Sequence, residues 1–514
     1  MSETPSSLAR DFFGRGGSHA FGIPGGGPSL EWVDAFQKAG GTFITTGHEA
    51  TGGFAAGAFG RLGHAAAALS IKGPGFANLI PALLSNRYEG NPMLVFSEAY
   101  ASGDSSGRRH KWLDQRAATP WLRHTLHPGD GPPVARALAA ARVESPSPVL
   151  VELPGGVCSS APYDSPGTFL PTTPDFSRLR QASRVMLIVG SCALRQPWGK
   201  KLGELRLPVF TTAAAKGALD ESLPHAAGIY TGDGKPATME ASLLPLADLV
   251  ILLGVRAGEI LSPRPPGKNC LAFEAPGPGG LDLFPDDPTD TRELDAAGEE
   301  ELFSLLSGMS WGVGAIAAAK KEQRAHLDSV DPQWGAAFDS LVSLAPEATH
   351  VLDTGNFTVL AEHFLSAAKP HSVLGTPNGR FMGAGIGHAL GAAFARPEQP
   401  VFLWIGDGGI RSYFSELALA AEHALPLLVI CLRDGYFGSI LGRALNAGFE
   451  TSPLLMRERH LDAAAGQLGL ASVRLQGLDQ LSEFAQQWMR SPTPTFAEVH
   501  LDSNLYLQTA SLFR

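Results

Sequence analysis

The chain has 514 residues, of which 44% are hydrophobic and 18% are charged. The length is sufficient for about three domains, and the composition indicates large hydrophobic cores and excludes a disordered protein. The formal net charge is −10, which argues against a nucleic-acid-binding protein, because such proteins depend on clustered Lys and Arg.

The N-terminal third alternates short apolar runs with small-residue helical patterns. Helices are predicted at 49–62 and from Gly75 to about Tyr88. Strands are predicted at 19–23, 42–46, 66–70, 92–96 and 148–153. This alternation predicts a parallel sheet covered on both faces, and we expect it to form a first domain over residues 1–160.

A second α/β domain is expected over residues 178–310. Residues 159–178 are rich in Pro, Ser and Thr, which is typical of a linker. The predicted strands of this domain are 185–190, 208–212 and 247–254. The Pro-, Gly- and Asp-rich stretch 262–292 is expected to interrupt the domain, and a helix at 313–327 is expected to lead out of it.

The last third, residues 330–514, is expected to form the third domain. A helix is predicted at 412–424, because its apolar side chains recur at helical spacing. Strands are predicted at 349–353, 372–375, 400–405, 426–432, 471–475 and 495–500. The predicted fold class is therefore α/β, with three consecutive doubly wound parallel-sheet domains, and ligands are expected at the carboxyl ends of the strands.

The Gly-rich turn 406–409 follows one of these strands and carries Asp407. Glycines let backbone N–H groups approach phosphate oxygens, and a carboxylate suits Mg²⁺. The next strand ends just before Asp434, so both carboxylates are expected at one sheet edge. The alternative is an ordinary strand–turn–helix connection with Asp407 as the helix cap, and the isolated motif favours neither interpretation.

Glu49 follows a short apolar run and begins a small-residue helix. A carboxylate shielded by apolar neighbours such as Ile44 and Phe54 is suited to proton transfer. The alternative is an acidic residue placed there only because the helix dipole favours it.

These segments resemble a known family of enzymes. Gly406 to Asp434 is similar to the thiamin diphosphate signature, Gly-Asp-Gly followed some two dozen residues later by Asn-Asn, although the pair is Arg433-Asp434 here. The pyrimidine-binding domain of acetolactate synthase-like and 2-oxoacid decarboxylase-like enzymes resembles residues 21–26, 48–49, 73–78 and 91–92. Their central domain resembles 208–217 and 247–254, and the segment that wedges the cofactor resembles 378–383. The resemblance covers nearly the whole chain and implies pyrimidine-binding, central and diphosphate-binding domains.

The resemblance implies thiamin diphosphate and Mg²⁺ as cofactors. The catalytic Glu49 would bond the cofactor's aminopyrimidine, Met382 would wedge under its rings, and the carbonyl of Arg380 would accept from its amino group. The metal ligands would be Asp407, Asp434 and the backbone carbonyl of Tyr436. The other residues expected at the cofactor are Pro24, Gly25, Gly73, Asn78, Thr354, Gly355, Asn356, Gly406, Gly408, Gly409, Tyr436, Phe437 and Gly438.

The resemblance further implies a carboligase or decarboxylase that acts on a 2-oxoacid donor through an enamine intermediate, and in carboligation on a second carbonyl compound. Polar residues after the N-terminal strands are candidates for substrate binding, with a solvated loop as the alternative: Gly26, Glu98, His110 and Gln115. Typical acetolactate synthases carry Lys in place of Pro120 and Gln near Glu98, which argues against ordinary acetolactate synthesis.

Other functions remain open at this stage. One is a simple non-oxidative decarboxylase that releases an aldehyde. Another is a cofactor-free relative with a regulatory or scaffold role, an alternative kept open by Arg433-Asp434. A dinucleotide-dependent oxidoreductase is disfavoured, because no complete G-x-G-x-x-G follows a strand. FAD is not expected, since Val189-Gly190-Ser191-Cys192 is a weak fingerprint.

The resemblance implies a homodimer or homotetramer with active sites at the subunit interface. No C-x-x-C pair indicates a zinc site or disulfide framework. The sequence shows neither a secretory leader nor a run of roughly 20 apolar residues, so we expect a cytoplasmic protein without membrane or nucleic-acid partners.

Overall fold

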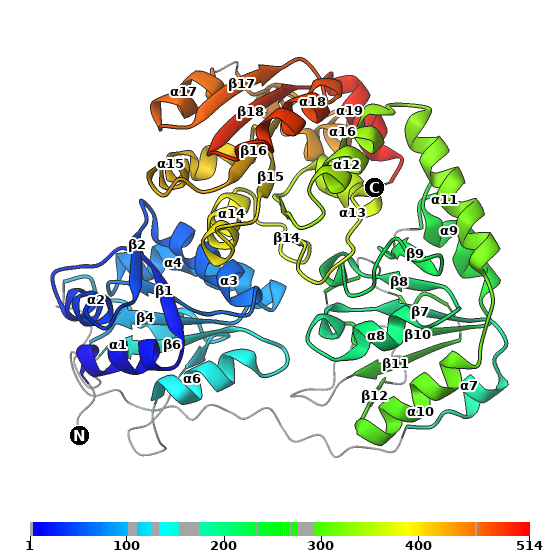
Figure 1. The fold of residues 1–514 in the computed structure, drawn as a ribbon, viewed down its shortest axis with the longest axis horizontal. Coiled ribbons are helices and arrows are strands. Elements are labelled where there is room, and N and C mark those ends of the chain that lie inside the picture. Colours follow the sequence, from blue (N-terminus) through cyan, green and yellow to red (C-terminus); the bar gives the residue numbers. More distant parts are fainter. Residues whose placement is uncertain are drawn as a thin grey trace.

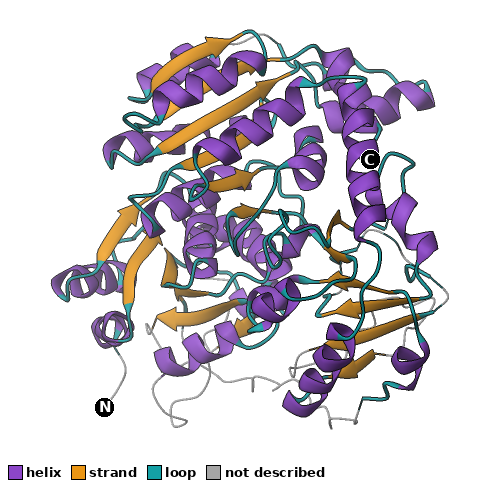
Figure 2. Ribbon diagram, turned by 45° about the vertical axis from the view of Figure 1, so that its right-hand side comes forward, coloured by secondary structure: helices purple, strands orange, loops and turns teal. Residues whose placement is uncertain are grey.

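The computed structural model describes residues 4–100, 110–124, 133–153, 174–274 apart from 233, 257, 261, 263 and 268, 291–457, and 460–513. Within these residues the chain forms three six-stranded sheets in succession, all with parallel pairing (Figure 1). Helices flank the strands of each sheet (Figure 2). The predicted fold class is therefore confirmed. Most of the predicted linker, residues 159–173, lies outside the described residues.

The first sheet has the strand order β2-β1-β3-β4-β6-β5. Its strands are β1 Gly17–Gly22, β2 Thr42–Thr45, β3 Ala65–Ser70, β4 Met93–Glu98, β5 Arg123–His124 and β6 Pro148–Leu153. The helices are α1 Pro5–Gly14, α2 Pro28–Lys38, α3 Glu49–Arg61, α4 Pro74–Glu89, α5 Gln115–Ala118 and α6 Pro133–Arg142. Every residue of β3 is buried, as expected for a strand covered on both faces.

The second sheet has the order β12-β11-β10-β7-β8-β9. Its strands are β7 Val185–Val189, β8 Val209–Thr211, β9 Ala226–Ile229, β10 Leu249–Leu253, β11 Cys270–Glu274 and β12 Thr291–Glu293. Its helices are α7 Ser177–Gln181, α8 Trp198–Gly203, α9 Met239–Leu243 and α10 Ala296–Ser307, and α11 Val313–Asp328 leads out. The prediction that 262–292 interrupts this domain was wrong at residues 270–274, because the apolar residues 270–273 pair with β10 and extend the sheet. Residues 275–290 lie outside the described residues.

The third sheet has the order β14-β13-β15-β16-β18-β17. Its strands are β13 Thr349–Leu352, β14 Val373–Gly375, β15 Val401–Gly406, β16 Leu427–Arg433, β17 Ala471–Leu475 and β18 Thr495–His500. Its helices are α12 Gln333–Leu344, α13 Asn356–Phe364, α14 Ala384–Ala395, α15 Ala418–Glu422, α16 Gly438–Ala447, α17 Leu461–Gln467, α18 Asp479–Trp488 and α19 Ser503–Ser511. No helix in the described part of the chain is long and apolar enough to cross a membrane.

The predicted helix at 412–424 was wrong over its first half. Short 3₁₀ turns cover Gly409–Ser412 and Phe414–Leu417, and only α15 is α-helical. Tyr413 between the turns has φ −139° and ψ 33°, which interrupts the helical hydrogen bonding. The apolar spacing survives because the segment still lies against the sheet, with Leu417 and Ala420 buried.

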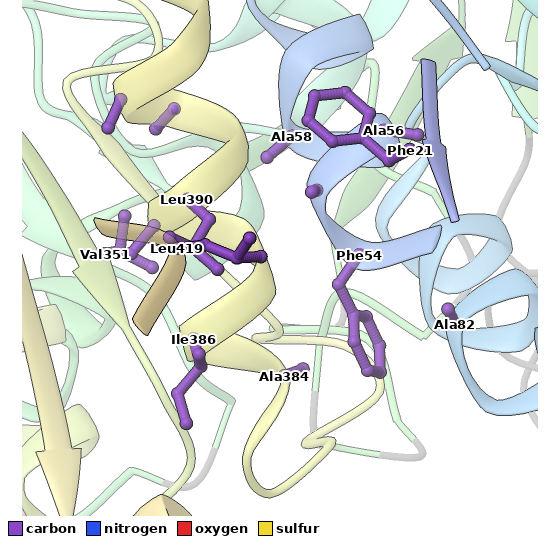
Figure 3. Close-up of a cluster of buried hydrophobic side chains, with 14 of the residues drawn as sticks. Phe21, Phe54, Ala56, Ala58, Ala82, Val351, Ala384, Ile386, Leu390 and Leu419 are labelled. Carbon is purple, nitrogen blue, oxygen red and sulfur yellow. The ribbon is translucent and has the colours of Figure 1, made fainter. Parts of the chain in front are cut away.

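The first and third domains share one hydrophobic core, which forms where α3 packs against α14 (Figures 1 and 3). Phe54 comes from α3, and Ala384, Ile386 and Leu390 come from α14. The helices approach closely because α14 carries glycine at the contact: a Cβ on Gly391 would lie 2.2 Å from the carbonyl oxygen of Ala55. The two domains of one chain are thereby fixed against each other.

Candidate active site

Glu49 is a buried carboxylate at the carboxyl edge of the first sheet. It is the first residue of α3, whose preceding residue His48 accepts the Ala50 N–H on Nδ1 at 3.0 Å. The side chain is 7% exposed, and its Oε2 accepts a hydrogen bond of 3.1 Å from Asn78 Nδ2. The predicted shielding residues Ile44 and Phe54 are both buried. Glu49 is therefore shielded from solvent and bonded to an amide donor, which suits a carboxylate that exchanges a proton.

The glycine turn after β1 is held in place by Glu98. Gly25 N–H donates to Ser29 Oγ at 2.8 Å, and Ser29 donates to Glu98 Oε1 from both its N–H and its hydroxyl, at 3.1 and 2.6 Å. Lys72 Nζ lies 3.4 Å from the other Glu98 oxygen. The structure thus gives Glu98, a predicted substrate residue, contacts that fix the turn carrying Pro24 and Gly25.

The other predicted substrate residues lie in different surroundings. Gln115 is buried, and its Nε2 donates to Ser97 Oγ at 3.2 Å and to the Glu98 carbonyl at 2.6 Å. His110 is exposed, and its carbonyl accepts from the Tyr100 hydroxyl. A Cβ on Gly26 would meet no atom within 4 Å. Of this set, Gly26 and His110 are therefore the ones that face open space.

Asp407 and Asp434 lie at the ends of the neighbouring strands β15 and β16. Asp407 accepts the Gly435 N–H at 3.2 Å, and Asp434 accepts the Tyr436 N–H at 3.2 Å. Burial, with the nearby charge of Asp434, raises the pKa of Asp407 to about 7. Burial also raises the pKa of Asp434. The raised pKa values show that two negative charges so close together are unfavourable. A divalent cation would stabilise both carboxylates in their ionised form, so the donor set fits Mg²⁺.

Two helices begin beside this acidic pair. The first, α13, starts at Asn356 directly after Thr354 and Gly355, and the second, α16, starts at Gly438. A Cβ on Gly438 would lie 2.4 Å from Asp434 Oδ2 and 3.3 Å from Asn356 Nδ2, so the two helix starts meet at the acidic pair. Backbone N–H groups at helix N-termini suit phosphate oxygens, and the arrangement fits a metal-bound diphosphate.

The described residues contain no cluster of three or more His, Cys, Asp or Glu side chains that could hold a metal. A metal bound here would have two carboxylates as side-chain ligands and would need carbonyl or ligand oxygens for the rest. The helix-capping interpretation of Asp407 is not supported either, since its hydrogen bond goes to Gly435.

Arg433, the residue that replaces Asn in the resemblance, has a carboxylate partner on β18. Its Nη1 lies 3.0 Å from Glu498 Oε1, and Glu498 is fully buried. His500 Nε2 also lies 3.0 Å from that oxygen, and the Asp462 N–H binds the other at 3.1 Å. Sequence reasoning missed Glu498; the signal was an acidic residue in the middle of a predicted buried strand.

The segment before α14 presents Met382 at the surface, where 46% of the residue is exposed. Arg380 adopts a left-handed conformation with φ 50°, and its guanidinium pairs with Glu362 at 2.9 Å. Asp353 accepts the Gly383 N–H at 2.9 Å and the Gly385 N–H at 3.0 Å. Met382 is therefore not a core methionine, and the turn that carries it is anchored by buried groups.

Family models match each of the three domains. The model of the thiamine pyrophosphate enzyme N-terminal TPP binding domain matches residues 14–120, that of the central domain matches 176–270, and that of the C-terminal TPP binding domain matches 353–499. All the metal and diphosphate candidates of the third domain, and Glu49 in the first, fall within these matches.

Individual proteins are similar over nearly the whole chain. A Pseudomonas aeruginosa protein described as a probable 2-ketoarginine decarboxylase is 27% identical over 92% of this chain and 90% of its own. A Bacillus subtilis acetolactate synthase is 23% identical over 97% of this chain and 93% of its own. A solved structure from Mycobacterium smegmatis, assigned to the thiamin diphosphate-dependent enzymes, superposes with a TM-score of 0.73 at 19% identity, covering 97% of this chain and 100% of that one.

Proposed function

Since the chain belongs to the thiamine pyrophosphate enzyme family, we propose that it is a Mg²⁺-dependent carboligase or decarboxylase acting on a 2-oxoacid donor. The observation that carries this proposal is the acidic pair Asp407 and Asp434 beside the starts of α13 and α16. The buried Glu49 in the other TPP-binding domain supports it.

Thiamin diphosphate, when bound, supplies the electron sink that makes loss of CO₂ from a 2-oxoacid feasible. Asp407, Asp434 and the Tyr436 carbonyl would hold Mg²⁺, and the N–H groups that open α13 and α16 would bind the diphosphate. Glu49 would hold a proton at a ring nitrogen of the cofactor and return it in each cycle. Its burial keeps bulk water from competing for that proton.

We propose that the active site is completed by a second copy of the chain, as a homodimer or homotetramer. The support is the exposure of apolar side chains beside the acidic pair, on and just after α16. These side chains are Ile440, Leu445, Phe449 and Leu455. Together with the exposed Met382 they would be covered, and would enclose the cofactor, if the first domain of a partner docked there.

A simple decarboxylase is the second candidate, favoured by the similarity to the Pseudomonas protein described as a 2-ketoarginine decarboxylase. A simple decarboxylase differs from a carboligase only in the acceptor, which is a proton instead of a second carbonyl compound.

FAD is not part of the proposed reaction. In the loop after β7, the Ser191 N–H already has a hydrogen-bond acceptor, because it donates to the Glu259 carboxylate at 2.9 Å. Thr212 Oγ1 donates to the same carboxylate at 2.9 Å. A carboxylate at this loop disfavours a phosphate there.

A donor and acceptor screen tests the function. The purified protein is loaded with thiamin diphosphate and Mg²⁺ and offered 2-oxoacids that include pyruvate and 2-ketoarginine, alone and with aldehyde or ketone acceptors. Release of CO₂ and mass spectrometry of the products are the measurements. A ligated product supports the carboligase and an aldehyde the decarboxylase. An unchanged melting temperature with the cofactors would contradict both and favour a cofactor-free relative.

A further inference from the structure

The turn that carries Arg380 and Met382 is held from two sides by buried carboxylates. Asp353 of the third domain binds its C-terminal end, as described above. Glu89, the last residue of α4 in the first domain, binds the other end: its Oε1 accepts the Gly379 N–H at 2.8 Å and the Asn378 N–H at 3.1 Å. The Asn378 side chain adds a hydrogen bond of 3.0 Å to the Tyr88 carbonyl. The N-terminal end of the turn is therefore anchored to another domain.

Glu89 lies where all three domains meet, and it is 2% exposed. Arg61, from α3, donates to the Glu89 carbonyl at 3.5 Å and to the carbonyl of Ala214 in the second domain at 3.2 Å. Arg256, which follows β10, packs on Gly90, where a Cβ would come within 2.3 Å of its Nη1. Residues from every domain of the chain thus lie around Glu89, and its carboxylate bonds to the third domain.

Burying a carboxyl group at this position costs free energy of desolvation, and filling the space alone would not require a carboxyl group. Burial raises the pKa of Glu89 to about 7, although the two N–H groups and the charges of Arg61 and Arg256 act in the opposite direction. An apolar side chain of similar size would avoid the desolvation. What such a side chain would lack is an acceptor for two backbone N–H groups of the turn, since buried N–H groups need partners.

We propose that Glu89 is a positioning residue for the cofactor: it fixes Asn378 and Gly379, and through them the Arg380 carbonyl and the Met382 side chain. Docking of the first domain onto the third within one chain therefore sets the geometry on which cofactor affinity depends. This inference rests on the proposed cofactor site.

The test compares two buried glutamates that differ in what they hold. Glu259 is a matched control, because it is 5% exposed, lies near Arg61 and accepts a backbone N–H, but binds Ser191 in the second domain. Glu89→Ala is expected to raise the dissociation constant for thiamin diphosphate, measured by calorimetry with Mg²⁺, by about tenfold or more. Glu259→Ala is expected to change it by less than about twofold, and Glu89→Gln, which keeps a carbonyl acceptor, should restore binding. Equal dissociation constants in Glu89→Ala and Glu259→Ala would overturn the proposal.

Hydrogen exchange in the cofactor-free protein gives a second readout, independent of whether the cofactor binds. Residues 376–385 are expected to exchange faster in Glu89→Ala than in Glu259→Ala. Glu89→Asp, whose carboxylate is shorter by one methylene, replaces the alanine variant if that fails to fold and is expected to shift exchange in the same direction. Unchanged exchange of this segment in folded Glu89→Ala or Glu89→Asp would overturn the proposal. Failure of the wild-type protein to bind thiamin diphosphate would instead contradict the proposed function.

Discussion

At the scale of single residues, Glu49 and Glu31 show that an acidic residue's position in a helix does not by itself determine its function. Both stand in the first turn of a helix of the first domain, where the helix dipole favours an acid. Glu49 is buried and bonded to Asn78, whereas Glu31 is exposed. Only the first environment suits a catalytic carboxylate, which makes Glu31 a natural control.

Glu49→Gln is expected to lower turnover by about 10²- to 10⁴-fold while thiamin diphosphate still binds, because the amide cannot exchange the proton but fills the same space. Steady-state rates and calorimetric binding measure the two effects separately. Glu31→Gln should leave both unchanged. Full activity in Glu49→Gln would remove the catalytic role.

The acidic pair leads to a second prediction. Asp407→Ala is expected to raise the Mg²⁺ concentration needed for the cofactor-dependent rise in melting temperature by about tenfold or more, since a charged ligand is lost. Asp434→Asn keeps an oxygen ligand and removes one of two mutually repelling charges, so its Mg²⁺ requirement should stay close to wild type. Mg²⁺ titrations followed by thermal unfolding test both variants. An unaltered requirement in Asp407→Ala would count against the metal site.

Glu89 predicts a pH dependence of stability in the cofactor-free protein. Its pKa rises from 4.5 to about 7 on folding, so between these values the unfolded chain releases a proton that the folded chain retains. The free energy of unfolding therefore falls as pH increases through this window. The charged groups that act on Glu89 are Arg61, Arg256 and Arg380.

Glu89→Gln removes this titration. Its melting temperature relative to wild type is expected to increase from pH 5 to about pH 7 and then to level off. Thermal melts at several pH values measure the difference. A difference that is constant, or that shrinks over this range, would contradict a raised pKa.

At the scale of elements, the contact of α3 with α14 depends on glycine. Gly391→Ala places a methyl group against the Ala55 carbonyl, and we expect it to lower the free energy of unfolding by about 1–3 kcal/mol. The control is Gly314→Ala in the exposed first turn of α11, where a Cβ would meet nothing within 4 Å and alanine should stabilise by about 0.5 kcal/mol. Denaturant unfolding distinguishes them. Equal stability of the two variants would mean that α3 and α14 can move apart to accommodate the methyl group without a loss of free energy of unfolding.

The elements also show which features a sequence pattern can predict. Apolar runs that end in Gly-rich turns predicted most of the central strands correctly, because a strand buried on both faces needs a continuous apolar stretch. The strand at 291–293 is an edge strand without an apolar run, and the apolar run at 270–273 is short and stands in a stretch of sequence rich in Pro, Gly and Asp. The helix predicted at 412–424 failed because spacing records which side chains face the sheet, not the backbone hydrogen bonds between them.

At the scale of the whole molecule, the sequence indicated Glu49, Asp407 and Asp434 through local motifs, but it gave no sign of contacts between domains. The pairing of Arg433 with Glu498 joins two strands, and the bonds from Glu89 to Asn378 and Gly379 join two domains across nearly 300 residues of chain. The first contact depends on which strands pair within one sheet, and the second depends on how finished domains dock. No local spacing records either. The proposed active site also depends on the docking of one subunit onto another, which can be tested directly.

Mixed dimers provide that test. Glu49→Gln and Asp407→Ala chains carrying different tags are co-expressed, and the mixed oligomer is isolated through both tags. Activity is measured at a Mg²⁺ concentration that supports the wild type but leaves either variant alone nearly inactive. If each active site combines Glu49 of one chain with Asp407 of its partner, the mixed dimer has one intact site and should show about half the wild-type specific activity. Activity no higher than that of the separate variants would contradict a site shared between two subunits.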